Sequence, residues 1–136
     1  MTIYEEKLKE CHIAMECAID APLSVNTLQL RYKLLDEELN ELKVEIESLC
    51  QELQTTGKTN ITTRARMLKE LSDLQYVLSG MAVSFNLPLE EAFLRVHQSN
   101  MSKLVDGKPL KRADGKFLKG PNYRPPHLED LAEKMR

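Results

Sequence analysis

Two short acidic motifs lie 32 residues apart in this 136-residue chain. The first places Glu38 and Glu41 three residues apart, and the second does the same with Glu70 and Asp73. At about 100° per residue, both pairs fall on the same flank of an apolar helical stripe. If the two helices pack against each other antiparallel on these stripes, the four carboxylates converge, which is unfavourable unless a cation lies between them. The spacing therefore predicts a metal site.

The chemistry of the ligands narrows the choice of metal. Four carboxylates form an all-oxygen cluster, which suits Mg²⁺, or Mn²⁺ in its place. A di-iron bundle would need Glu-x-x-His pairs, and neither motif contains the histidine. The alternative is that each acidic pair is only a solvated helix face, but the repeat in the same phase argues against it. We therefore expect magnesium.

Helical periodicity predicts the elements that carry these motifs. Apolar residues at helical spacing indicate helices at about 3–19, 26–54, 62–85 and 88–104. A polar, glycine-containing turn at 55–60 and two proline-containing breaks separate them. The predicted fold is all-α, of four-helix-bundle type. The apolar stripes that should be buried in it are Leu28, Tyr32, Leu35, Leu39, Leu42, Ile46 and Leu49 in the second helix, and Met67, Leu71, Leu74, Leu78 and Met81 in the third.

The chain changes character after residue 104. Residues 103–124 hold seven basic residues against two acidic ones, a net +5, whereas residues 1–102 hold ten basic against sixteen acidic, a net −6. Two Asp-Gly-Lys triplets and several prolines predict an irregular segment, in which the second Asp-Gly is a candidate for closing a short β-hairpin. We expect a helical bundle at 1–104 and a basic C-terminal arm with a short terminal helix at 105–136, within one domain.

The composition excludes several classes of protein. The net charge of −2 gives no overall attraction to nucleic acid or to a membrane surface. No segment approaches the roughly 20 apolar residues of a membrane span, and the charged start lacks a secretory signal, so a cytosolic location is expected. Cys11, Cys17 and Cys50 show no metal-binding spacing and are predicted to be buried free thiols.

The predicted fourth helix ends on an unexpected pair of side chains. Its inner apolar face continues onto Asn100 and Lys103, where the pattern calls for apolar residues. Either the helix end emerges into solvent, or this amide and amine contact phosphate oxygens held by the metal, as lysine does elsewhere.

Together these residues resemble the MazG-like branch of the all-α nucleoside triphosphate pyrophosphohydrolases. The family's acidic marks are EExxE on one helix and ExxD on the next, and here Glu37 precedes Glu38 and Glu41 to complete the first. The run SNMSK at 99–103 and the arm DGK…DGKFLKGPNYRPP are similar to a compact subgroup from bacteria, phages and mobile elements. The resemblance covers roughly residues 26–126.

The resemblance implies a Mg²⁺-dependent cut between the α and β phosphates of a nucleoside triphosphate. The products would be a monophosphate and pyrophosphate, typically in the house-cleaning of unwanted or damaged nucleotides. The family usually forms four-helix units completed by dimerisation, so a homodimer or tetramer is expected. Neither the base, the sugar nor the physiological substrate is encoded in a short motif.

The resemblance also implies roles for individual residues. Glu37 or Glu45 would orient or deprotonate the attacking water, and the sequence does not decide between them. Lys103 and Asn100 would bind the phosphates. Further expected contacts to phosphate or base are Lys119 and Tyr123 in the arm; His12 is a weaker candidate, since a structural histidine is the commoner case. The expected metal ligands are Glu38, Glu41, Glu70 and Asp73.

Two other functions remain open. Phosphoribosyl-ATP pyrophosphohydrolase shares the fold and the metal logic, although the SNMSK and KGPNYRPP segments argue mildly against it. A helical adaptor without catalytic activity, whose basic arm binds an acidic partner, would leave the repeated acidic motif unexplained.

Overall fold

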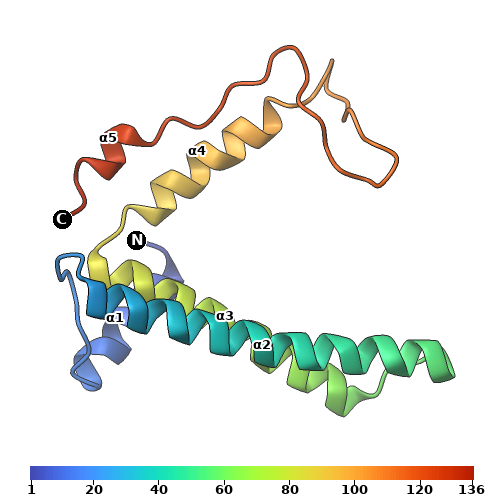
Figure 1. The fold of residues 1–136 in the computed structure, drawn as a ribbon, viewed down its shortest axis with the longest axis horizontal. Coiled ribbons are helices and arrows are strands. Elements are labelled where there is room, and N and C mark those ends of the chain that lie inside the picture. Colours follow the sequence, from blue (N-terminus) through green and yellow to red (C-terminus); the bar gives the residue numbers. More distant parts are fainter. The chain divides into compact units, whose positions relative to one another are not determined.

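The computed structural model describes all 136 residues and contains five helices and no strand. The helices are α1 (Ile3–Ala14), α2 (Val25–Thr56), α3 (Ile61–Phe85), α4 (Leu89–Met101) and α5 (Glu129–Ala132) (Figure 1). The prediction of an all-α fold is confirmed. The chain divides into two compact units, 1–87 with Arg136 and 88–135. None of the helices is both long enough and apolar enough to cross a membrane.

In the first unit, α2 and α3 form a long helical hairpin, and α1 packs against α3 (Figure 1). Gly57 ends α2 with a φ of 72°, a left-handed conformation that glycine adopts without strain. The Asn60 side chain then caps α3 by accepting a hydrogen bond from the backbone N–H of Thr62. Glu52 on α2 accepts a bond from the Asn60 N–H at 2.9 Å, which ties the turn to the preceding helix. These local signals fix α2 and α3 as antiparallel neighbours.

Two predicted helix ends differ from the structure. The first helix ends at Ala14, not near residue 19, because Glu16 adopts a φ of 56° and the chain turns away. The fourth ends at Met101, three residues early, and Pro88 precedes it as the N-cap residue. Single apolar residues follow each helix at helical spacing, Ala18 after α1 and Leu104 after α4, so the spacing alone overestimated the length.

The apolar stripes are only partly buried within the first unit. Leu42 is buried, but Leu39 and Ile46 on α2 are 54% and 46% exposed, and Leu71 and Leu78 on α3 are 47% and 42% exposed. The prediction that these four residues are buried is wrong for the unit by itself. It is also wrong for Leu28 and Tyr32 on α2, which are 37% and 70% exposed. The three helices of this unit do not supply enough surface to cover both sides of the α2–α3 hairpin.

The cysteines follow the prediction only in being free. Cys11 is half-buried, whereas Cys17 and Cys50 are exposed. Cys17 lies beyond the end of α1, and Cys50 lies off the apolar stripe of α2, so neither has a neighbouring helix to cover it. The expectation of buried thiols is wrong for these two residues.

The second unit consists of α4, the arm and α5. The arm contains two isolated antiparallel bridges, Val105 with Lys108 and Lys111 with Phe117, and no strand. The second Asp-Gly does make a tight turn, in which Gly115 has a φ of 90°, but it closes one bridge and no extended hairpin. The predicted terminal helix is present as the four residues of α5.

Side-chain contacts hold the end of the arm to α4 within this unit. Arg95 on α4 donates to both carboxylate oxygens of Asp130, at 2.6 and 3.0 Å, and also to the backbone oxygen of His127. The compact unit begins at Pro88, so α4 groups with the arm, whereas the sequence placed a boundary at residue 104. The grouping of all helices and the arm into one domain stays a prediction.

Candidate metal centre

The acidic residues of the two motifs meet on facing sides of α2 and α3. Glu38, Glu41, Glu70 and Asp73 each offer one carboxylate oxygen, and these oxygens all lie within 4.8 Å of one another. Glu41 is exposed, and the other three are half-buried. Because both motifs have the same phase against their apolar stripes, antiparallel packing of α2 on α3 brings their flanks together. The geometry that the spacing predicts is therefore present.

Two oxygens in this cluster lack a partner. Glu38 Oε2 and Glu70 Oε2 are both inaccessible to solvent and accept no hydrogen bond. A buried carboxylate oxygen without a donor is costly, on the order of 1–3 kcal/mol or more for a charged group. Hard cations such as Mg²⁺ take carboxylate oxygens as ligands. The four carboxylates with two unpaired oxygens therefore fit the magnesium ion that the sequence predicts.

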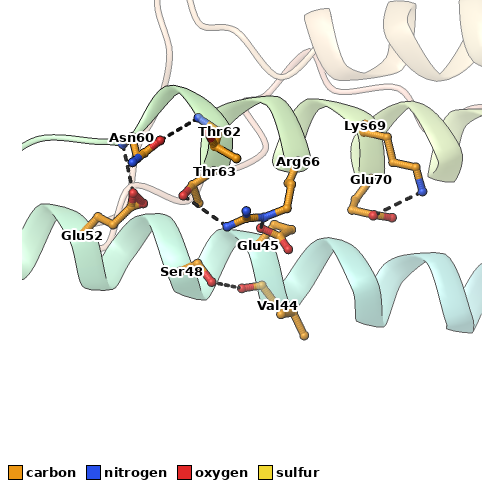
Figure 2. Close-up of polar contacts among 10 residues, drawn as sticks. All are labelled: Val44, Glu45, Ser48, Glu52, Asn60, Thr62, Thr63, Arg66, Lys69 and Glu70. Carbon is orange, nitrogen blue, oxygen red and sulfur yellow. Dashed lines mark hydrogen bonds and ion pairs between the residues drawn. The ribbon is translucent and has the colours of Figure 1, made fainter.

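The chain places one ammonium group against this cluster. Lys69 Nζ lies 2.7 Å from Asp73 Oδ2 and 3.4 Å from Glu70 Oε1 (Figure 2 draws the second contact). The hydrogen bond with Asp73 is the main reason that the pKa of Lys69 is raised. The pKa of Glu70 is also raised, first by desolvation and then by the neighbouring Glu41, although Lys69 acts in the opposite direction. One lysine does not offset four carboxylates.

A second basic residue on α3 engages one of the two candidate bases. Arg66 Nε donates to Glu45 Oε2 at 3.0 Å, and its Nη2 donates to Thr63 Oγ1 at 3.3 Å (Figure 2). Glu37, by contrast, is exposed and has no ion pair or hydrogen bond from its side chain. Sequence reasoning missed Lys69 and Arg66. Both are within four residues of an acidic residue of the α3 motif, so helical spacing could have indicated them.

The residues predicted to bind phosphate lie in the second unit. Asn100 is exposed in the last turn of α4, and Lys103 follows that helix, half-buried. The Lys119 ammonium lies 4.7 Å from the centre of the Tyr123 ring, so these two form a cation–π pair. Neither lysine forms a salt bridge with a carboxylate, which leaves both available to an anionic ligand.

His12 has a structural environment. It is buried in α1, and its Nδ1 lies 2.9 Å from the backbone oxygen of Ala18. Since a carbonyl only accepts, Nδ1 carries the hydrogen and donates it. This bond ties the end of α1 to the loop that follows, and it accounts for the histidine without a substrate contact.

Two packed antiparallel helices, each contributing two carboxylates to one cluster, are consistent with the all-α nucleoside triphosphate pyrophosphohydrolase fold. Within this class, residues 4–100 match the family described as phosphoribosyl-ATP pyrophosphohydrolase, and the chain belongs to that family. A search of the curated proteins finds no match.

The family match alters the balance of the hypotheses. The family is one of pyrophosphohydrolases, enzymes that hydrolyse an acid anhydride. The family is described as phosphoribosyl-ATP pyrophosphohydrolase, which was the alternative to a general nucleoside triphosphate pyrophosphohydrolase. The family match supports this alternative better than the general activity. The match ends at residue 100, and the basic arm lies outside it.

Proposed function

We propose that this chain is a Mg²⁺-dependent pyrophosphohydrolase that cuts a nucleoside triphosphate group between its α and β phosphates. The observation that carries the proposal is the convergence of four carboxylate oxygens within 4.8 Å in a member of a pyrophosphohydrolase family. An adaptor without catalytic activity would have no need for two unpaired buried carboxylate oxygens in this cluster. The products are a monophosphate and pyrophosphate.

The first substrate candidate is phosphoribosyl-ATP, because the family that matches most of the chain is described by that activity. The second candidate is a canonical or damaged nucleoside or deoxynucleoside triphosphate, hydrolysed to clear the nucleotide pool. The observation that favours the second is the arm at 105–136, which the family match does not cover and which resembles a compact MazG-like subgroup. Both substrates present the same triphosphate to the site.

In this proposal Glu38, Glu41, Glu70 and Asp73 hold the metal, with Mn²⁺ able to replace Mg²⁺. Bound there, the ion would polarise the phosphates and lower the pKa of a water molecule. The carboxylates of the chain supply the negative charge that retains the cation, and the half-buried positions of three of them limit competition from solvent. Lys69 gives up its contacts with Asp73 and Glu70 when the cation binds.

We propose Glu37 as the residue that orients or deprotonates the attacking water. The Glu45 carboxylate already accepts a hydrogen bond from Arg66 Nε at 3.0 Å, so one of its oxygens is occupied by a donor from the chain. Glu37 has no such partner and lies one helical turn before Glu41 on the same side of α2. Glu37→Gln should therefore lower turnover more than Glu45→Gln does.

Lys103 and Asn100 bind the phosphates of the substrate in this proposal. A lysine acts as a point charge on phosphate oxygens, and its charge is most effective as negative charge accumulates in the transition state. Lys119 and Tyr123 are proposed as outer contacts of the same substrate, with the Lys119 charge already held against the ring.

The exposed apolar residues of α2 and α3 support self-association. Leu39, Ile46, Leu71 and Leu78 leave large apolar side chains in contact with solvent, and clusters of this kind mark interaction surfaces in soluble proteins. We propose a homodimer or tetramer, and light scattering of the full chain measures the mass. Ile46→Glu should reduce that mass, since it places a charge on the apolar surface.

The function is tested with a panel of phosphoribosyl-ATP and the common ribo- and deoxynucleoside triphosphates, each with Mg²⁺ and with EDTA. Pyrophosphate and orthophosphate are measured separately. Pyrophosphate from phosphoribosyl-ATP alone supports the first substrate, and pyrophosphate from the simple triphosphates supports the second. Orthophosphate as the sole product would overturn the assignment of the cut bond, and no product from any of them would favour the adaptor.

A further inference from the structure

The second unit contains a hollow between the end of α4 and the arm. Its volume is about 380 Å³, within the roughly 300–1,000 Å³ of small-molecule sites. Two polar residues, Asn100 and Lys103, lie at the hollow. The rest of the lining is apolar: Met101, Leu104, Pro109, Leu110, Phe117 and Leu118.

Backbone contacts hold the walls of this hollow in place. Leu118 N–H donates to Leu110 O at 2.7 Å, and Gly120 N–H donates to Lys103 O at 3.1 Å, which brings the arm back to the end of α4. A Cβ atom on Gly120 would lie 2.7 Å from Lys103 O and 2.7 Å from Val105 Cγ2. Only glycine permits this approach, so the chain is built to close the arm over the helix end.

The polar residues at the hollow have no partners in the chain. The Lys103 ammonium forms no salt bridge, and the side-chain amide of Asn100 makes no hydrogen bond. Phe117 is 55% exposed although it is the largest apolar side chain of the lining, and the Lys111 Nζ lies 5.1 Å from the centre of its ring. An apolar hollow with an aromatic ring and one unpaired cation suits a ligand that has a flat ring and an anionic group close to it. A nucleotide is a ligand of this kind.

We propose that this hollow binds the nucleobase of the substrate, with Phe117 as the residue on which the base stacks. The inference rests on the proposed function, in which Lys103 and Asn100 bind the phosphates. A base attached to those phosphates then enters the apolar lining beside them. Stacking on an aromatic ring tolerates different bases because each base presents a flat π face. The arm, which lies outside the family match, thereby contributes to substrate selection.

The test compares two ligands that share the phosphates and differ in the base. The full chain is titrated by calorimetry, with Mg²⁺ present, against α,β-methylene-ATP, which cannot be cut at the α–β bond, and against inorganic tripolyphosphate. Phe117→Ala should weaken α,β-methylene-ATP binding about tenfold or more, within the range for removal of a stacking ring, and change tripolyphosphate binding less than about twofold. Phe117→Tyr keeps an aromatic ring and should restore the affinity for α,β-methylene-ATP.

Phe93→Ala is the matched control, since Phe93 is exposed on α4 in the same unit and does not line the hollow. It should leave the binding of both ligands unchanged. Circular dichroism checks that each variant keeps its helices, and light scattering checks its mass. If Phe117→Ala instead lowers the mass and leaves both affinities intact, the hollow receives a side chain of a second copy and the proposal is wrong.

The outcomes separate this inference from the proposed function. A wild-type chain that hydrolyses a triphosphate while Phe117→Ala binds α,β-methylene-ATP normally would overturn the base site and leave the function standing. Binding that depends on Phe117 in a chain that releases no pyrophosphate would support the site and overturn the function. Equal losses for both ligands in Phe117→Ala would also overturn the base site, because they would show an effect on the phosphates or on the fold.

Discussion

The α2–α3 hairpin and the basic arm are opposite in charge and in the way that their residues are positioned. In the hairpin, residues three apart on a regular helix lie on one side, so the acidic cluster follows from spacing and from antiparallel packing. In the arm, backbone bonds between distant residues, such as Gly120 to Lys103, decide where side chains lie. The candidate metal site therefore depends on helical regularity, whereas the candidate substrate contacts depend on a fold-back that one glycine permits.

The largest effect should come from the acidic half of this comparison. Asp73→Asn keeps the size of the side chain and removes one carboxylate from the cluster. Loss of a metal ligand removes several kcal/mol of charge stabilisation, and 1.36 kcal/mol is a tenfold change in rate, so pyrophosphate release should fall at least ~10³-fold. The measurement is turnover at saturating Mg²⁺, with Asp36→Asn on the opposite side of α2 as the control.

The same variant separates a metal site from an acidic surface through its stability. Mg²⁺ binds only the folded state, so it should stabilise the parent by ~2.7 kcal/mol at a hundred times its dissociation constant, and Asp73→Asn should lose most of this gain. In EDTA the variant should melt close to the parent or above it, because removing a charge relieves repulsion while the exposed ion pair with Lys69 contributes little to stability. A variant that melts far below the parent in EDTA, or turns over at its rate, would refute the cluster.

The next largest loss of turnover should come from a lysine of the second unit. Lys103→Ala should lower turnover about 10²-fold, the scale for loss of one donor to a developing anion, without loss of helical content. Lys108→Ala is the matched control, since Lys108 is an exposed lysine of the same arm that does not line the hollow. Equal activities of the two variants would mean that Lys103 only lies at a solvated helix end and does not bind the phosphates.

The sequence predicted the hairpin better than the arm for a physical reason. Periodicity reports which side of a helix faces the core, and it correctly aligned the acidic residues of α2 with those of α3. It did not report where a helix ends when the pattern continues, as it does beyond Ala14. It also treated Leu39 and Ile46 as buried, because periodicity marks a face as apolar without stating whether the same chain covers it. The contact of Gly120 with Lys103 has no local signal at all.

Removal of the lysine at the acidic cluster should have a smaller effect. Lys69→Met keeps much of the side-chain length and removes the ammonium that contacts Asp73 and Glu70. Without Mg²⁺ the variant should lose little stability, since the lysine is largely exposed. Half of the stabilisation by Mg²⁺ should be reached at a lower Mg²⁺ concentration in this variant, because the cation no longer has to displace the Lys69 ammonium group. Lys43→Met, at the exposed pair with Glu47, should not change the Mg²⁺ dependence.

The smallest expected effect is a pH dependence of stability whose sign differs between the hairpin and the arm. The pKa of Glu70 is raised above its ordinary 4.5 in the folded chain, by desolvation and by Glu41. The folded state therefore binds more protons than the unfolded state between 4.5 and the raised pKa, so without metal the stability should increase as the pH falls through this window. Glu70→Gln cannot take up the proton and should remove this contribution, and Mg²⁺ should suppress it in the parent because cation and proton compete for the same oxygens.

Asp114 in the arm is the counterexample, since Arg112 lowers its pKa and the stability that it contributes is lost as the pH falls. Denaturant melts in EDTA at several pH values, of the parent, Glu70→Gln and Asp114→Asn, measure both signs. A parent and a Glu70→Gln variant that show the same pH dependence would mean that the Glu70 carboxyl is not held against Glu41 in solution.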